Sequence, residues 1–500
     1  MSRAQRRVET DSRSAGMHTV LRDLQPKAIT ALPKLRRMKS TRRSFIASGL
    51  AAATATTLYR PVSAASADGP SVLCIAGDTL ITRRVQRRGD SSFGAVAKLL
   101  QNADVGIASG VMTFERGPAL APFPKGIDLN LLGPASGAAD LRWMGLRLLS
   151  YAGNHALDYG IDGLRATLHN LRQAAVGVAG AGETLEESAR PSYADHRTGR
   201  VALIGCATTF PESWMAANAR HDAAGRPGVN GIRLDLTYRL AAHELEQLSQ
   251  IGRTLAPGIE PLHDLVPDAD GLLGSSANSR EGVSFLDRKF VRGEPGVDAV
   301  PRAPDMKRLF ASIEEARRSG ATACVMVHEH GTYGPGTFLQ KMARDCIDAG
   351  ADCFLVSGSH IFGAIEIYRR KPILYGLGNL FFEYDTLSHV PAEVFEAYGF
   401  DPQRDEAGSV LRALSERYFD RQPHYWESAI VRLNFRAGEC LALEIHPISL
   451  RSSNGAVTVR GTPRLASAAD ASGILERIAN ASRPFGTLLS IDGSIGLIRP

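Results

Sequence analysis

Short apolar runs alternate with amphipathic stretches from residue 71 onward. The apolar runs, each ending in polar residues, predict strands within residues 71–78, 104–108, 146–155, 200–208, 322–331, 352–360 and 371–379. Helical periodicity predicts helices within residues 92–103, 160–175, 303–320 and 337–350. Strands that alternate with helices along the chain are typical of a layered α/β fold.

Two segments interrupt this alternation. Residues 212–302 are rich in Gly, Pro and Asp and only weakly periodic, which predicts an insertion or a long cap over one face. Residues 384–425 are similar but more helical in character. Strand-like runs at 427–435 and 440–449 and a helix near 466–481 follow, so we expect residues 385–500 to complete or cap the domain.

Polar side chains gather where the predicted strands end. Single strands deliver one or two of them each: Asp78, Asn154 with His155, His328 with His330, His360, and Asn379. In a layered α/β sheet the carboxyl ends of parallel strands share one edge, and sites form in the crevice there. A lone histidine after a strand is more often a structural hydrogen-bonding group, so the prediction of a site depends on the joint pattern.

The types of these side chains predict a divalent metal ion. Carboxylate oxygen, amide oxygen and imidazole nitrogen together suit a divalent ion such as Mn²⁺, Fe²⁺ or Zn²⁺. Such an ion acidifies a water molecule and orients a phosphoryl or carbonyl oxygen.

The N-terminal region has the composition of an export signal. Residues 1–67 hold 13 of the 58 Lys and Arg residues but 3 of the 52 Asp and Glu residues, a net charge of +10, so the rest of the chain carries −4. Arg42 and Arg43 precede a weakly apolar segment and the small residues Ala65-Ser66-Ala67. This pattern resembles a twin-arginine signal cleaved after Ala67, and translation could also start at Met38.

The leader accounts for the basic charge of the chain, and no basic face with interleaved aromatic residues is visible elsewhere. We therefore expect no nucleic acid as a partner. The six cysteines form no CxxC pair and lie in apolar contexts, which predicts free buried thiols.

Four blocks of sequence, in this order, resemble a known family: "IAGDTLITRR", "YAGNHALDYGIDGLRATLHNLRQAAVGVAGAG", "VMVHEHG" and "DAGADCFLVSGSHIFGAIEIYRRKPILYGLGNLFFE". They resemble the bacterial capsule-synthesis CapA family, also called poly-gamma-glutamate biosynthesis proteins. The resemblance covers most of residues 71–384 outside the insertion. It implies a metallophosphatase-like fold, which is a four-layered α/β/β/α sandwich with, here, a long insertion and a C-terminal extension.

The resemblance also implies roles for single residues. The metal ligands would be Asp78, Asn154, His155, His328, His330 and His360, with His155 and His330 also acting in catalysis; the "HEHG" repeat leaves open which of His328 and His330 is the family's histidine. The residues that would bind substrate are Arg83, Arg226 in the "GRPGVN" loop, and Asn379. Solvated charge is an equal alternative for Arg83, and Asp158 is expected to cap or start the helix after it.

The chain departs from the family pattern at two places. Ser109-Gly110-Val111 stands where the family commonly has Asn-Leu-Glu, with Glu115 as the nearest substitute. Ser357 replaces one histidine of a "GHHPH"-like motif. A two-metal site would thereby lose part of its ligands.

Three functions remain open at this point. The first is an exported CapA-like protein that acts in the synthesis, release or handling of an anionic extracellular polymer, for example poly-gamma-glutamate, by metal-assisted hydrolysis. The second is a binding or assembly protein without catalysis on the same fold. The third is a true phosphodiesterase with an unrelated substrate. We expect the protein to be periplasmic or extracellular, either free or tethered to the membrane. Its expected partners are an anionic polymer or phosphorylated substrate and a membrane-bound polymer synthase on a separate chain.

Overall fold

The computed structural model describes residues 69–85, 91–115, 120–125, 128–255, 282–285, 288–331, 338–436, 438–451 and 460–500. The predicted signal in residues 1–67 lies outside the described residues. Within the described segments, no helix combines the length and the apolar character needed to cross a membrane.

The first large sheet carries the N-terminal strands of the fold. Its strand order is β23-β24-β21-β20-β1-β2-β5-β6, with β19 also paired to β1 and β22 to β21. The strands are β1 (Ser71–Leu80), β2 (Val105–Ser109), β5 (Leu146–Ser150), β6 (Gly177–Ala179), β19 (Asn379–Phe382), β20 (Glu427–Arg436), β21 (Glu439–Ser449), β22 (Arg464–Leu465), β23 (Ser490–Asp492) and β24 (Ile495–Ile498).

The second sheet has the order β17-β18-β16-β15-β9-β8. Its strands are β8 (Ser192–His196), β9 (Gly199–Ala207), β15 (Thr322–His328), β16 (Cys353–Ser357), β17 (Ile365–Tyr368) and β18 (Lys371–Leu374). One apolar cluster joins the facing sides of both sheets, with Ile75 and Leu148 from the first and Leu203 and Met326 from the second. The two sheets therefore pack face to face.

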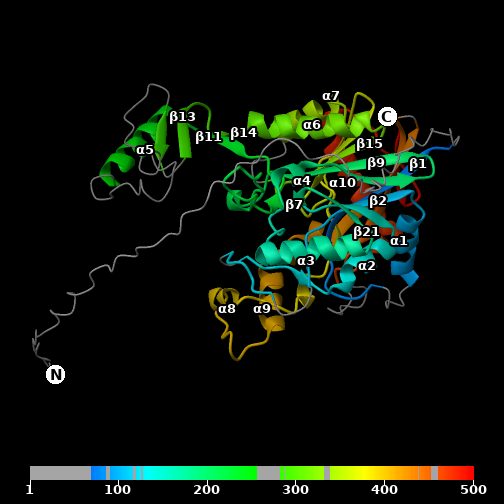
Figure 1. Ribbon diagram of the computed structural model, residues 1–500, viewed down its shortest axis with the longest axis horizontal. Helices are drawn as coiled ribbons and strands as arrows, with labels where there is room; N and C mark the ends of the chain where they lie inside the picture. The colour runs from blue at the N-terminus through cyan, green and yellow to red at the C-terminus, as the bar shows by residue number, and fades with distance from the viewer. Residues whose placement is uncertain are drawn as a thin grey trace, which may run out of the picture. The chain divides into compact units, whose positions relative to one another are not determined.

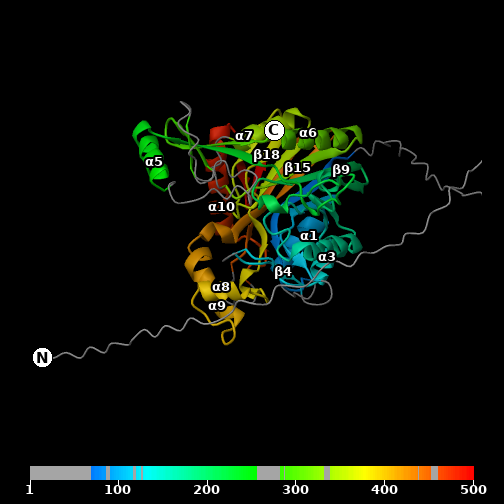
Figure 2. The same ribbon diagram turned by 60° about the vertical axis from the view of Figure 1, so that its left-hand side comes forward.

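Helices cover the two outer faces, as Figures 1 and 2 show. The first sheet is covered by α1 (Ser91–Gln101), α2 (Ser136–Trp143) and α3 (Gly160–Gln173), which share an apolar cluster with its outward side. The second is covered by α6 (Ala303–Arg318) and α7 (Phe338–Asp348). The predicted four-layered α/β/β/α sandwich is thus confirmed. The six cysteines are all buried and free, as predicted.

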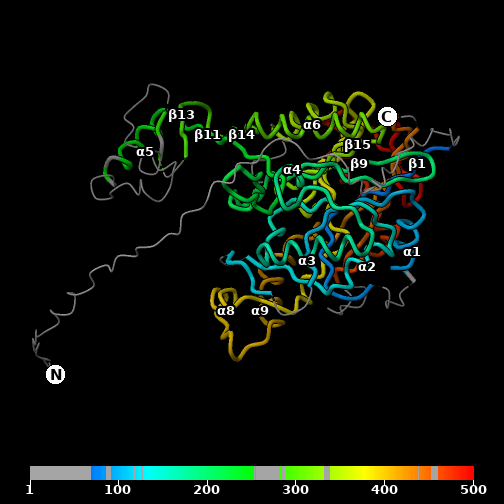
Figure 3. Tube along the Cα trace, viewed as in Figure 1, coloured from blue at the N-terminus to red at the C-terminus, as the bar shows by residue number. Residues whose placement is uncertain are grey.

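The C-terminal segment contributes to this body. Strand β20 pairs antiparallel with β1, so residues after 384 extend the first sheet, and α10 (Ala468–Ser482) packs on β21. Between β19 and β20, apolar residues of α8 (Ala392–Ala397) and α9 (Ala407–Leu414) join the cluster on the helical side of the first sheet. Figure 3 shows these two helices together below α3.

The insertion is more regular than its sequence predicts. A separate four-stranded sheet has the order β12-β13-β11-β14 and is accompanied by α5 (Ala242–Leu255). Its strands are β11 (Leu234–Leu240), β12 (Val283–Phe285), β13 (Arg288–Arg292) and β14 (Gly296–Pro301). Most of the residues in these strands are exposed or half-buried, so their apolar pattern is weak. For this reason the sequence analysis did not predict the strands.

The remaining elements are short and lie within the segments that connect the longer strands and helices. They are β3 (Thr113–Phe114) paired with β4 (Leu132–Gly133), β7 (Ala181–Gly182) paired with β10 (Gly228–Val229), α4 (Leu185–Ala189), and single helical turns at Glu212–Trp214, Tyr384–Thr386, Ser415–Phe419, Pro423–Trp426 and Arg483–Phe485.

Parallel pairing fixes where the functional edge lies. Strands β1, β2 and β5 run parallel, as do β9, β15 and β16, so the carboxyl ends within each set share an edge. Gly77 makes a close approach possible there, because a Cβ on it would lie 1.9 Å from the carbonyl oxygen of Gly378. The Asp78 amide then donates to that same carbonyl at 3.0 Å.

Candidate metal centre and pocket

A cavity of about 220 Å³ lies at the strand ends. It is lined by polar residues from both sheets, and every strand-end residue predicted from the sequence contributes: Asp78, Asn154, His155, His328, His330, His360 and Asn379, joined by Asp128. The structure therefore brings these side chains together in one pocket, from strands as far apart in sequence as β1 and β19.

Three of these residues form a direct contact group. His328 Nε2 lies 3.0 Å from Asn154 Oδ1 and 3.1 Å from His330 Nε2, and its Nδ1 lies 3.3 Å from the hydroxyl of Ser357. A serine hydroxyl both donates and accepts, so Ser357 is compatible with either tautomer of His328. When Nδ1 carries the proton, Nε2 is free to bind a metal.

Glycines on both sides make room for these imidazole rings. A Cβ on Gly153 would lie 3.1 Å from the His328 ring, and one on Gly358 would lie 2.9 Å from His328 Nε2 and from the His330 ring. Gly358 also has a φ of 93°, which favours glycine. Both histidines of "HEHG" reach the pocket, whereas the buried Glu329 between them contacts Thr208 and Thr209 instead.

A second group contains Asp78, His360 and Asn379. His360 Nδ1 lies 2.9 Å from Asn379 Oδ1 and 3.5 Å from Asp78 Oδ2. His360 has a φ of 58°, a strained conformation for a non-glycine residue that structures retain mostly at functional sites. The amide nitrogen of Asn379 donates to the Tyr425 carbonyl at 3.0 Å, which turns its oxygen toward His360.

Asp78 is buried without the donors that a buried carboxylate normally has. It is 1 % exposed, and in the described part of the chain neither carboxylate oxygen is met by a donor with hydrogen-bond geometry. Burial raises the pKa of Asp78, while the charge of His360 and, more weakly, polar contacts with the Ser109 hydroxyl and the Gly358 amide oppose this shift. A buried carboxylate with such weak donors is costly, and coordination of a cation would remove that cost.

The imidazoles of His328 and His330 are in the protonation state that binds metals. Burial, followed by repulsion from neighbouring histidines, holds the pKa of His328 well below its usual range and lowers the pKa of His330 to about 3. Both rings are thus neutral at pH 7, as a metal ligand must be.

The chemical types of these side chains fit a divalent metal. The histidines and the aspartate contact one another in pairs, His328 with His330 and Asp78 with His360, rather than in one group of three or more. In the part of the chain that the structure describes, no three His, Cys, Asp or Glu side chains are close enough together to hold an ion. Each group is completed by an amide oxygen, from Asn154 or Asn379, and such oxygens suit hard and borderline ions.

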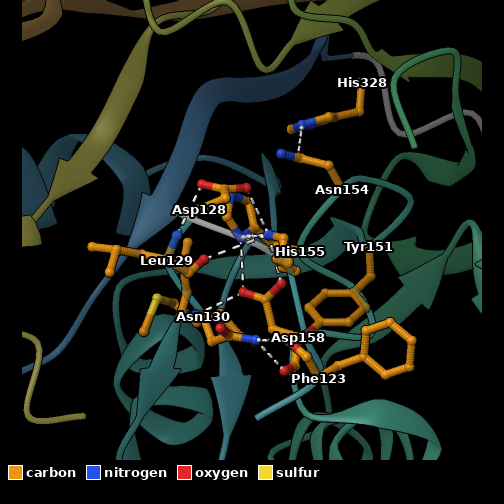
Figure 4. A network of polar contacts seen from close by, with 12 residues as sticks. Phe123, Asp128, Leu129, Asn130, Tyr151, Asn154, His155, Asp158 and His328 are labelled. Atoms are coloured by element: carbon orange, nitrogen blue, oxygen red, sulfur yellow. Dashed lines mark hydrogen bonds and ion pairs between the residues drawn. The ribbon is translucent and has the colours of Figure 1, made fainter. Parts of the chain in front are cut away.

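His155 is oriented by Asp158, for which the sequence predicted another role, and by Lys125, which the sequence analysis did not identify. Its Nδ1 lies 2.8 Å from Asp158 Oδ2, and the Lys125 ammonium donates to Asp158 Oδ1 at 2.9 Å and lies 3.2 Å from the same imidazole nitrogen. The Leu131 amide donates to Asp158 Oδ2 at 2.6 Å. Figure 4 shows His155 and Asp158 close together beside Asp128.

The prediction that Asp158 caps the next helix was wrong. Tyr159 is the residue at the N-cap of α3 and makes no side-chain capping bond, while Asp158 is fully buried and points to Lys125. The spacing of three residues between His155 and Asp158 was the available signal for their contact.

Two residues predicted to bind substrate lie elsewhere. Neither Arg83 nor Arg226, both in described segments, is part of the pocket wall. Arg83 forms an ion pair of 3.0 Å with the buried Glu383, and Arg226 donates to the Met215 carbonyl at 3.0 Å. The expectation that they bind substrate remains an untested prediction that their positions do not favour.

The departures from the family pattern have visible consequences. Val111 presents an apolar side chain to the pocket where the resemblance implies a carboxylate, and Glu115 is not part of the described pocket wall. Ser109 pairs with Asp78 across β1 and β2. The wall between Asp78 and Asn154 therefore has fewer metal donors than the family pattern implies.

In the metal-free protein, these neutral histidines should make stability depend on pH. An unfolded histidine binds a proton below about pH 6.5, whereas folded His330 binds one only near pH 3. The unfolded state therefore holds more protons, and the free energy of unfolding falls on acidification from pH 6.5, by about 1.4 kcal/mol per pH unit for each such group. Urea unfolding in EDTA at pH 7 to 5 should show a shallower slope for His330→Gln, but not for the exposed His389→Gln. Equal slopes would contradict the assignment.

Comparison with known proteins identifies a family and several similar proteins. The family model described as "Bacterial capsule synthesis protein PGA_cap" matches residues 72–384. The chain is 30 % identical over 453 residues to "Uncharacterized protein y4sH" of Sinorhizobium fredii, covering 86 % of this chain and 93 % of that one. It is 22 % identical to "PGA biosynthesis protein CapA" of Bacillus subtilis over 61 % of this chain and 62 % of that one. It is also 22 % identical to "Capsule biosynthesis protein CapA" of Bacillus anthracis, over 62 % and 59 %.

Proposed function

The chain belongs to the bacterial capsule synthesis family PGA_cap, and from this premise we propose that it hydrolyses an anionic ester or amide linkage with the help of a divalent metal during the handling of an extracellular polymer. The observation that carries the proposal is the buried Asp78 carboxylate, which no donor among the described residues meets at close hydrogen-bond geometry. It lies 3.5 Å from His360 Nδ1, in a pocket that also holds two neutral imidazoles.

Two sets of side chains would hold the metal. Asn154, His328 and His330 form the first, and Asp78, His360 and Asn379 form the second. A divalent ion supplies positive charge that draws an anionic oxygen into the pocket and acidifies a water molecule. Mn²⁺, Fe²⁺ and Zn²⁺ all accept such nitrogen and oxygen donors.

His155 is positioned to move a proton. Because Asp158 holds its Nδ1, the ring orientation is fixed and Nε2 remains for exchange with a group in the pocket. Asp158 and Lys125 act as positioning residues, since they contact His155 from outside the pocket wall. His330 would share in catalysis or ligate the metal.

A second candidate is a binding or assembly role without hydrolysis. It is favoured by Val111 and Ser357 at positions where the family pattern has metal or acid–base groups. In that case the same pocket would bind an anionic polymer or a phosphorylated ligand for a membrane-bound synthase on another chain.

Metal content separates these two functions. We expect about one or more equivalents of Mn, Fe or Zn in the purified protein by elemental analysis, and loss of the metal in the double variant Asn154→Ala/His155→Ala. The matched control Ser388→Ala/His389→Ala changes an exposed polar-histidine pair and should keep the metal. A protein that takes up none of the three ions after incubation would rule out the hydrolase and leave the binding role.

We also propose that the protein is exported by the twin-arginine route and works in the periplasm or outside the cell, either free or tethered. The support is the Arg42-Arg43 pair with its apolar segment and small-residue cleavage site. Arg42→Lys/Arg43→Lys should retain the protein in the cytoplasm, as fractionation and blotting would show. Unchanged export of this variant would refute the route.

A further inference from the structure

We propose that the pocket is specific for an anionic ligand that carries one apolar ring beside its anionic group, and that Phe419 and Tyr384 are the residues that determine this specificity. The inference rests on the proposed function, since the metal would bind the anionic end. It adds the class of substrate that the pocket accepts.

The pocket has two chemically different halves. One half holds the imidazoles, amides and carboxylates of the candidate metal centre. The other half is apolar and is formed by Leu80, Val111, Leu131, Phe382, Tyr384 and Phe419. A ligand that fills both halves must be polar at one end and apolar at the other.

Phe419 reaches the pocket from an unusual turn. Helix α9 continues directly into a π-helical turn, Ser415–Phe419, and single π turns of this kind occur frequently at functional sites. The ring of Phe419 packs edge-on against Tyr384 at 4.4 Å and against Phe382 at 5.2 Å between centroids. Phe382 in turn lies 5.5 Å from the ring of His360, so the aromatic wall adjoins the metal-binding side chains.

Within this wall, Phe419 comes from the C-terminal segment, whereas Phe382 and Tyr384 belong to the matched family region. The family match ends at residue 384, whereas Phe419 lies 35 residues later in the chain. The helices that carry it pack on the first sheet through Val410, Leu411 and Leu414. Packing alone would explain those three residues, but it does not require Phe419 to line a cavity.

Size and charge restrict what the pocket can hold. A cavity of 150 Å³ lined by apolar side chains is known to hold a benzene molecule, so about 220 Å³ accommodates one ring with a small anionic head. No Lys or Arg is among the described residues that line the pocket. A second anionic group on the same unit of the ligand would therefore meet no cation among the described residues of the apolar half.

Two phosphonates that differ only in the apolar group test the inference. Phenylphosphonate and methylphosphonate carry the same anionic head and are not hydrolysed. In calorimetric titrations of the Mn²⁺-incubated protein we expect phenylphosphonate to bind at least 10-fold more tightly. Phe419→Leu and Tyr384→Leu should reduce this preference to less than 3-fold, while Tyr418→Leu, a change at the exposed neighbour of Phe419 that is 44 % exposed, should leave it intact.

The outcomes separate this inference from the proposed function. Equal affinity for the two phosphonates would overturn the specificity while leaving the metal and anion site in place. A preference that survives both Phe419→Leu and Tyr384→Leu would overturn the role of the aromatic wall. If neither phosphonate binds although the metal is present by elemental analysis, the anion site and the inference both fail. Urea unfolding of each variant confirms that affinity changes do not arise from loss of the fold.

Discussion

Replacing Asp158 with alanine is expected to destabilise the protein by about 3–5 kcal/mol, a loss typical of breaking a buried ion pair. Asp158 is fully buried and its two oxygens accept from three donors, on Lys125, His155 and the Leu131 backbone. Without the carboxylate, the Lys125 ammonium, whose side chain is 8 % exposed, would keep the more solvent-exposed Asp128 as its charged partner among the described residues. Urea unfolding at pH 7.5 measures the change.

Asp162→Ala is the matched control for this variant. Asp162 lies in the first turn of the same helix, α3, but is exposed, so its loss should cost less than about 1 kcal/mol through the helix dipole. Asp158→Asn keeps the shape of the side chain and removes its charge, and should fall between the two. A cost below 1 kcal/mol for Asp158→Ala would show that the network does not stabilise the fold and that His155 is held by other contacts.

The strand-end residues could be placed from the sequence because their positions follow from simple rules. Apolar runs such as those before Asp78 and His328 mark buried strands, and parallel strands bring their carboxyl ends to one edge. The structure gathers Asp78, Asn154, His328, His360 and Asn379 at that edge without further assumptions. Hydrophobic periodicity was also sufficient to predict the layered fold, because each helix that covers a sheet has one apolar stripe.

The residues that support the site could not be placed in this way. Lys125 comes from a Pro-containing loop and Phe419 from a π-helical turn, and neither segment has a periodic pattern that fixes the direction of a side chain. Asp158 follows a strand by several residues and has the sequence context of a helix cap, so local rules favoured the wrong partner. Its true partner, Lys125, is 33 residues away and is determined by tertiary packing.

Asp78→Asn is expected to act in opposite directions on metal binding and on the stability of the metal-free protein. Loss of the carboxylate should weaken metal affinity by about 100-fold or more, since even residues that only support the ligands cost 10–100-fold when changed. In EDTA the same variant should be more stable than the wild type by about 1–3 kcal/mol, because a buried charge that lacks donors is replaced by a neutral amide. Burial raises the pKa of Asp78, so this gain is present above the folded pKa and vanishes as pH falls toward 3.8, where the wild-type carboxyl is also protonated.

Asp140 provides the contrasting variant. It is equally buried, but it accepts from the Val85 amide at 2.9 Å and pairs with Arg84 at 3.3 Å. Asp140→Asn should therefore destabilise the protein with or without metal, by about 1–3 kcal/mol. Urea unfolding in EDTA and in Mn²⁺ compares the two variants directly.

If Asp78→Asn also destabilised the metal-free protein, Asp78 would be a structural residue satisfied by its neighbours. If it stabilises that protein and loses the metal, the fold bears the cost of this carboxylate so that a cation can bind, which is the physical signature of a site maintained for function.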